Sequence, residues 1–299
     1  MTHRAKRSRK RRFIGLMLAV LLIVGITIWL SNRAGQSDSA AVVTLPPNFT
    51  RIASHPPPEF TNQMSIADIT DTQYLKLVNR QHGISTPVHP ALLVSAWPNI
   101  AVSTTAVTVH RTALYSLQEL FAAARDENLR SLFIASGFRT DEEQQTLYQS
   151  AADKRYVMPP GHSEHHLGLG VDILFSGSYA AGGILGTPES AWLAQNAPQF
   201  GLVLRYPYDK QDITEVAYEP WHFRYVGRVH ARLMDQYNFV LEEYIEFLRQ
   251  NMGYQTTLDG KYYYILHQHP KNGMILVPNG MEFNVSSTNT GGYIVTAWR

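Results

Sequence analysis

Hydrophobic residues along this 299-residue chain fall into three different patterns. Phe13 to Leu30 is an unbroken apolar stretch without a charged side chain. From about residue 110 to 250, apolar positions recur every three to four residues or gather in short runs, which predicts helices and buried strands. Beyond Gly253, aromatic and β-branched residues are separated by Asp-Gly and Asn-Gly pairs. The chain therefore divides into an apolar N-terminal segment, a helix-and-strand region and a β-rich end.

Four segments of the central region have the features of helices. Apolar residues recur at helical spacing in residues 110–129. A second helix is expected to begin at Thr140, because three acidic residues fill its first turn. A third runs from Thr187-Pro188 to Gly201, with a start and a stop signal at its ends. Residues 240–248 predict a closing amphipathic helix.

Short apolar runs between these helices predict buried strands at residues 131–136, 171–175, 202–206 and 221–226. We therefore expect an α+β fold, with a small mixed or antiparallel sheet flanked by helices. Asp-Gly and Asn-Gly pairs signal hairpins, so residues 253–299 are expected to form a small all-β domain.

The N-terminal segment is predicted to anchor the chain in a membrane. Residues 13–30 are about as short as a bilayer-spanning helix can be, and seven Lys and Arg residues precede them. The positive-inside rule makes residues 1–12 a cytoplasmic tail and puts the rest of the chain outside. A cleaved signal peptide is the alternative, but its cleavage site normally follows closely, and here Ala40-Ala41 lies about ten residues downstream. We expect no nucleic-acid partner, because an apolar segment follows the basic tail directly.

The remaining boundaries come from composition. Residues 31–60 are small and polar and then proline-rich, which is typical of a linker. Residues 61–252 are the expected catalytic domain. The chain has no cysteine, which excludes a lipoprotein anchor, a thiol nucleophile, thiolate zinc ligands and disulfides.

Metal-capable side chains are concentrated in the stretch GHSEHHLGLGVDI, residues 161–173. His165 and Asp172 lie seven residues apart, and a turn through the glycines between them would aim both at one point. Fifty residues later come Glu219 and His222. Two imidazoles and one carboxylate can bind zinc and leave a fourth position open, with Glu219 beside the water as its base. A purely structural role for these histidines remains open at this stage.

The chain lacks the sequence motifs of several other enzyme classes. The chain contains neither S-x-x-K nor K-T-G, no G-x-S-x-G elbow, no H-E-x-x-H helix and no nucleotide-binding glycine pattern. We therefore set aside a penicillin-binding-type or G-x-S-x-G serine enzyme and a nucleotide-binding enzyme.

Three separated segments together resemble one family. SGFRT followed by Gln144, the stretch from Ser163 through His165 to Asp172, and Glu219-Pro220-Trp221-His222 are similar to the motifs of VanY-type zinc D,D-carboxypeptidases. The resemblance covers roughly residues 110–250 strongly and the β-rich end more loosely. One departure is Gly170, where the family motif most often has alanine.

The resemblance implies one zinc ion per chain, held by His165, Asp172 and His222, with Glu219 as general base. It also implies that Arg139 stabilises the oxyanion. Family positions that line the pocket make substrate contacts plausible for Gln144, Ser163 and Trp221. The implied substrate is a peptidoglycan stem peptide ending in D-Ala-D-Ala, outside the membrane, and the implied role extends to glycopeptide resistance. No obligate protein partner is evident.

Three alternatives remain open. An L,D-carboxypeptidase or a peptidoglycan endopeptidase would use the same zinc chemistry. A non-catalytic wall-binding protein would keep the site as a relic. The β-rich end could also be the functional part, tethering the wall through aromatic residues such as the run 262–264, although packing on alternate faces of a strand explains that run equally well.

Overall fold

The structure is a computed structural model, and it describes residues 49–51, 56–70, 72–176 and 184–299. The expected cytoplasmic tail and membrane segment, residues 1–30, lie outside the described residues. Among the described helices, none has the length and apolar content that crossing a bilayer requires. All described residues belong to one compact unit, residues 47–299, and the architecture below is that of this unit.

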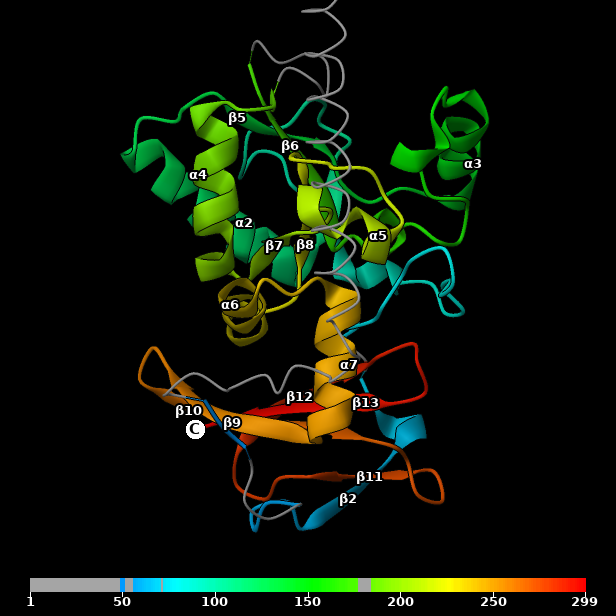
Figure 1. Ribbon diagram of the computed structural model, residues 1–299, viewed down its shortest axis with the longest axis vertical. Coiled ribbons are helices and arrows are strands. Elements are labelled where there is room, and N and C mark those ends of the chain that lie inside the picture. Colours follow the sequence, from blue (N-terminus) through cyan, green and yellow to red (C-terminus); the bar gives the residue numbers. More distant parts are fainter. Residues whose placement is uncertain (1–48, 52–55, 71, 177–183) are drawn as a thin grey trace, which may run out of the picture. The chain divides into compact units, whose positions relative to one another are not determined.

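A four-stranded antiparallel sheet forms the centre of the unit, in the order β5-β6-β8-β7 (Figure 1). Its strands are β5 (Leu132–Ser136), β6 (Gly170–Phe175), β7 (Leu202–Leu204) and β8 (His222–Tyr225). All four strands that the apolar runs predict are confirmed, and the sheet is antiparallel throughout. A separate short pair, β3 (Leu93–Ser95) with β4 (Thr108–His110), precedes it in the chain.

The four predicted helices are also confirmed, and the two for which the sequence offers a start signal, α3 and α4, begin where that signal predicts. Thr140 and Glu143 form a capping box at the start of α3 (Asp141–Ser150), and Thr187 caps α4 (Pro188–Asn196) with proline in its first turn. The sequence analysis missed α6 and the short α5. The other helices are α2 (Arg111–Asp126), α5 (Gln211–Thr214), α6 (Arg228–Tyr237) and α7 (Leu241–Asn251).

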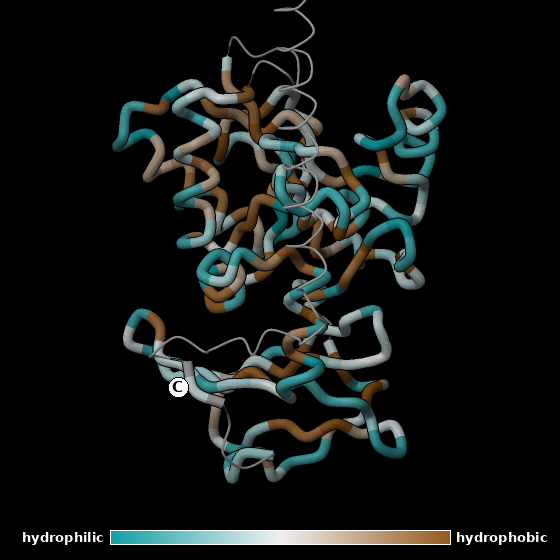
Figure 2. Tube along the Cα trace, in the orientation of Figure 1, coloured by the Kyte–Doolittle hydropathy of each residue, from teal (hydrophilic) through white to brown (hydrophobic). Residues whose placement is uncertain are grey.

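The main core lies between the central sheet and the helices next to it. Figure 2 shows hydrophobic segments along the strands and their neighbouring helices, with hydrophilic loops outside. Alternation along β6 buries Val171 and Ile173 completely, which leaves Asp172 between them on the opposite face. Other members of this core are Leu117, Leu120, Ile134, Leu167, Leu169 and Phe223.

Residues 253–299 contribute five strands to two further sheets, a five-stranded antiparallel sheet ordered β1-β9-β10-β13-β12 and a two-stranded pair, β11-β2, in which β1 and β2 come from before residue 66. The expected all-β character is confirmed. Tyr264 packs in the core of this region against Phe60, which supports a packing role for part of the tyrosine run. The strands are β1 (Phe49–Arg51), β2 (Asn62–Ser65), β9 (Gly253–Leu258), β10 (Lys261–Gln268), β11 (Met274–Val277), β12 (Glu282–Ser287) and β13 (Tyr293–Trp298).

Of the three Asp-Gly and Asn-Gly pairs beyond Gly253, only one joins two strands that pair with each other. Asp259-Gly260 joins the paired strands β9 and β10, and both residues have positive φ. Asn279-Gly280 instead connects β11 to β12, which lie in different sheets. The reason is that β11 pairs with β2, a strand about two hundred residues earlier in the chain.

The segments at the two ends of the described chain are joined by strand pairing. Strand β1 lies inside the expected linker and pairs with β9. Strand β2 lies in the expected catalytic domain and pairs with β11. Residues 47–299 accordingly form one compact unit without a division at residue 252.

A buried hydrogen-bond chain links α6 and α7 to this sheet. The two ring nitrogens of His230 lie 2.7 Å from the Tyr244 hydroxyl and 2.9 Å from Thr296 Oγ1. The Tyr244 hydroxyl in turn lies 2.8 Å from that of Tyr254. Burial lowers the pKa of His230 to about 3, so its imidazole is neutral at physiological pH.

We expect the His230→Gln variant to be less stable than the parent chain at pH 7 but less sensitive to acid. Between pH 6.5 and 3 the unfolded chain binds a proton at His230 that the folded chain does not, so the parent loses stability as pH falls. From pH 7 to 4.5 this adds about 3 kcal/mol to its loss. Urea unfolding at both pH values, with the exposed His89→Gln as control, measures the difference. Equal acid sensitivity of parent and variant would contradict the assignment.

Candidate active site

A short helical turn brings the first histidine into the pocket. Ser163 caps the 3-10 turn Glu164–Leu167, which contains His165. Gly168 ends this turn in the left-handed conformation at φ 64°, and an added Cβ would lie 2.9 Å from the His110 backbone nitrogen. Any other residue would therefore be strained here for two reasons: its backbone would have to adopt the left-handed conformation, and its Cβ would be too close to the His110 backbone. This glycine lets the chain turn at once from His165 into β6.

Strand register brings the other two ligands together. Asp172 on β6 is directly paired with His222, the first residue of β8. The turn before β8 is closed by a 3.2 Å hydrogen bond from the His222 backbone N–H to the Glu219 carbonyl. The turn that starts β8 therefore also places Glu219 at the pocket wall.

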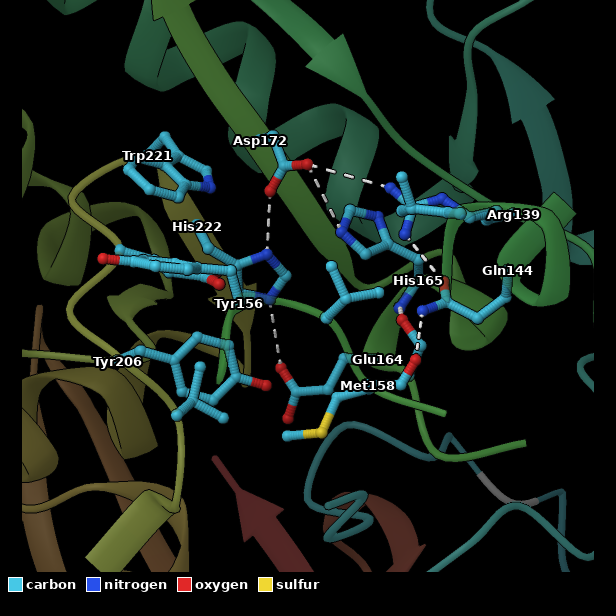
Figure 3. Close-up of a pocket in the computed structure, with 15 residues that line it drawn as sticks. Arg139, Gln144, Tyr156, Met158, Glu164, His165, Asp172, Tyr206, Trp221 and His222 are labelled. Carbon is cyan, nitrogen blue, oxygen red and sulfur yellow. Dashed lines mark hydrogen bonds and ion pairs between the residues drawn. The ribbon is translucent and has the colours of Figure 1, made fainter. Parts of the chain in front are cut away.

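One ligand atom from each of His165, Asp172 and His222 lies within 4.8 Å of the other two (Figure 3). Asp172 Oδ2 is 3.4 Å from His165 Nε2, and Asp172 Oδ1 is 2.8 Å from His222 Nδ1. His165 Nδ1 lies 2.6 Å from the Gly137 carbonyl and donates to it, which leaves the Nε2 lone pair facing the centre. Two imidazoles and a carboxylate with one open side fit a zinc ion.

The charges of the ligands are set by burial and by one another. Burial lowers the pKa of His165, which favours the neutral form that binds metal. Burial also lowers the pKa of His222, but its hydrogen bond to Asp172 and the negative charge of the nearby Glu164 outweigh this and raise the pKa to about 9. A metal ion at His222 Nδ1 must displace the proton shared with Asp172, so metal affinity should increase with pH.

Glu219 has the properties of a proton carrier. Its side chain is buried, and this burial raises its pKa to about 8, with His222 and Arg139 opposing the rise and Asp172 adding to it. A carboxyl group with a pKa near the working pH can both accept and release a proton.

Arg139 is held in place rather than free to move. Its Nη2 donates to Ser136 Oγ at 2.9 Å and lies 4.0 Å from Asp172 Oδ2. Its Nη1 donates to Gln144 Oε1 at 2.7 Å, while Gln144 Nε2 donates to the Met158 carbonyl at 2.6 Å. The buried amide of Gln144 thus joins Arg139 to the Met158 backbone and holds the guanidinium in the pocket wall.

All eight residues singled out from the sequence line one cavity of about 290 Å³. Trp221 forms part of its wall and stacks with Tyr156 at 6.2 Å between ring centroids. The eight are Arg139, Gln144, Ser163, His165, Asp172, Glu219, Trp221 and His222.

Sequence reasoning missed several residues around the ligands. Tyr206 stacks on the His222 ring at 5.0 Å between centroids, and the buried residues Glu164, Arg205 and Arg224 lie behind the same ring. A signal existed, since Arg205 and Arg224 each stand within a run that the sequence predicts as a buried strand. Charged residues rarely occur at such positions without a partner.

We expect Glu219→Gln to stabilise the metal-free protein at alkaline pH. The folded-state pKa of Glu219 lies above that of the unfolded chain, so stability falls as pH rises from about 4.5 to 8, when the unfolded chain ionises first. The variant lacks this loss, and its advantage should grow by roughly 3 kcal/mol between pH 5 and 8. Urea unfolding of chelator-treated samples, with the exposed Glu142→Gln as control, measures it. A constant difference between parent and variant would show that Glu219 titrates normally.

Comparison with known proteins agrees with this geometry. The VanY family, described as D-alanyl-D-alanine carboxypeptidase, matches residues 106–228. A D-alanyl-D-alanine carboxypeptidase of Enterococcus faecium is 40% identical over 167 residues, which cover 55% of this chain and 53% of that protein. The chain thus matches about half the length of this relative.

Two further relatives match over nearly their full length. The bifunctional D-Ala-D-Ala dipeptidase and D-Ala-D-Ala carboxypeptidase VanXYC of Enterococcus gallinarum is 31% identical over 189 residues, covering 60% of this chain and 96% of that protein. The crystal structure of the vancomycin-resistance D,D-dipeptidase VanXYg, in complex with a D-Ala-D-Ala phosphinate analogue, has a TM-score of 0.69 and 27% identity, covering 80% of this chain and 98% of that one. With the matched motifs converging in one pocket, the chain belongs to the VanY family of D-alanyl-D-alanine carboxypeptidases.

Proposed function

We propose that this chain is a zinc-dependent D,D-carboxypeptidase that removes the terminal D-alanine from peptidoglycan stem peptides ending in D-Ala-D-Ala. The observation that carries the proposal is the convergence of His165, Asp172 and His222 in a pocket that Glu219 and Arg139 also line. The substrate assignment is supported by the relatives, whose names specify D-Ala-D-Ala as their substrate.

The residues of the pocket divide the reaction between them. A zinc ion bound by the three ligands would supply Lewis acidity, which lowers the pKa of a coordinated water to about 7. Glu219 accepts a proton from the attacking water and delivers it to the amine of the leaving D-alanine. Arg139 faces the negative charge that develops on the former carbonyl oxygen. The products are a stem peptide shorter by one residue and free D-alanine.

The shape of the pocket suits a small peptide terminus. Its volume is about 290 Å³, and the stacked rings of Tyr156 and Trp221 form an apolar wall. Methyl side chains such as those of alanine can pack against such a wall without leaving polar groups unpaired. We assign Ser163 and Trp221 to contacts with the D-Ala-D-Ala end. Removal of that end would eliminate the group that vancomycin-type antibiotics bind, which gives the proposed role in resistance.

The purified chain, loaded with zinc, should release one alanine from a stem pentapeptide ending in D-Ala-D-Ala, as followed by mass spectrometry. A chelator should abolish the reaction and zinc should restore it, whereas penicillin should have no effect, since the chain lacks the S-x-x-K serine that penicillin acylates. Glu219→Gln should retain zinc but lower kcat by about 10²- to 10⁴-fold.

Other products would indicate other functions. Cleavage of a tetrapeptide with an intact pentapeptide would indicate an L,D-carboxypeptidase. If the zinc-loaded chain cleaves neither peptide, an endopeptidase or a wall-binding protein with a relic site would be favoured. Inhibition by ordinary penicillin concentrations would reject the metal-dependent mechanism.

We further propose that residues 13–30 anchor the chain in the cell membrane, with residues 1–12 in the cytoplasm and the catalytic unit outside. The apolar run and the basic cluster before it support this assignment. The full chain should remain with membranes after a high-salt wash, and protease added to protoplasts should digest the catalytic unit. Deletion of residues 13–30 should move the protein to the soluble fraction. A mature chain that begins near Ala41 would instead identify a cleaved signal peptide.

A further inference from the structure

A fully buried carboxylate lies behind the metal-ligand histidine. Glu164 immediately precedes His165 in the chain, yet its side chain points toward His222 (Figure 3). Its Oε2 lies 3.6 Å from His222 Nε2. Neither Glu164 nor the other charged groups at its far side take part in the steps assigned to the pocket above.

Both atoms that face each other across this gap lack a hydrogen-bond partner among the described residues. His222 Nε2 and Glu164 Oε2 are each buried and unpaired. The other ring nitrogen, Nδ1, faces Asp172 at 2.8 Å and so belongs to the ligand cluster. A neutral imidazole that offers Nδ1 to a metal carries its proton on Nε2, which is the nitrogen that faces Glu164.

We propose that Glu164 is a positioning residue of the metal site, accepting the Nε2–H of His222 and so fixing the ring with its Nδ1 lone pair toward the metal. The inference rests on the proposed zinc site. Carboxylates that accept from the outer N–H of a ligating histidine orient the ring and raise its basicity. The two unpaired buried atoms are then each other's partners when the metal is bound.

Two arginines hold Glu164 for this task. Arg205 Nε lies 2.8 Å from Glu164 Oε1, and Arg224 Nη1 lies 2.9 Å from the same oxygen. Both guanidinium groups are buried, as is the carboxylate between them. They keep the carboxylate ionised and occupy Oε1, which leaves Oε2 for His222. Arg224 Nη2 is held in turn by three backbone carbonyls, those of Gln73, Tyr74 and Lys76.

The competing explanation is that Glu164 serves only to neutralise the two arginines. A matched control separates the two roles. Glu242 also binds Arg205, accepting from Nη1 at 2.9 Å and from Nη2 at 2.7 Å, whereas Glu164 accepts from Nε. Glu242→Gln therefore removes one charge from the same arginine without touching the Glu164–His222 gap.

The test measures the zinc dissociation constant of the full chain by competition with a chromophoric chelator. Glu164→Gln should weaken zinc binding about 10- to 100-fold, and Glu242→Gln should change it less than about threefold, with circular dichroism confirming that both are folded. Equal zinc affinity of Glu164→Gln and the parent would overturn the proposal, as would equal weakening in both variants. A parent chain that binds no zinc would instead reject the proposed function itself.

Should Glu164→Gln fail to fold, nitrogen-15 NMR of the zinc-loaded parent chain decides the question. The His222 ring should carry its proton on Nε2, with a downfield proton signal and slow exchange with solvent. A proton on Nδ1, or an Nε2–H that exchanges freely, would overturn the proposal.

Discussion

The antiparallel pairing of β6 with β8 is the constraint on which the metal-ligand cluster depends. In this register Asp172 lies opposite His222, and both side chains line the pocket. Because successive residues of a strand point to opposite faces, a slip by one residue would turn one ligand away from the other. The hydrophobic core opposes such a slip, since Val171 and Ile173 on either side of Asp172 are completely buried. The alternation of side chains along β6 therefore both buries Val171 and Ile173 in the core and directs Asp172 into the pocket.

Part of the candidate site was predictable from sequence because it lies within one short segment, from His165 to Asp172. The turn after His165 requires a glycine at residue 168, and strand alternation places Asp172, so short segments carry the necessary information. Strand partners are not local. The pair Asn279-Gly280 has the residues of a hairpin turn, but β11 pairs with β2 instead of β12. Turn residues specify a backbone conformation and do not specify which strands meet.

The buried charges could not be assigned from sequence for a different reason. A pattern of apolar and polar positions treats a charged residue as exposed, yet the side chains of Glu164, Arg205 and Arg224 are inaccessible to solvent. Burying one such charge alone would be strongly destabilising. Here the ion pairs among the three residues, and the ion pair of Arg205 with a second carboxylate, that of Glu242, offset this cost. Only the three-dimensional arrangement reveals that each charge has its partner.

The C-terminal strands contribute to this arrangement through the segment before the central sheet. The backbone N–H groups of Thr72 and Leu77 donate to the carbonyls of Val285 and Thr288, each at 3.0 Å. Between them, the Leu75 N–H donates to the Ser286 hydroxyl, also at 3.0 Å. The carbonyls of this same segment accept from Arg224, which binds Glu164 behind His222. The β-rich end thus holds the backbone on which the buried charge network rests, and this accounts for its presence in one compact unit with the pocket.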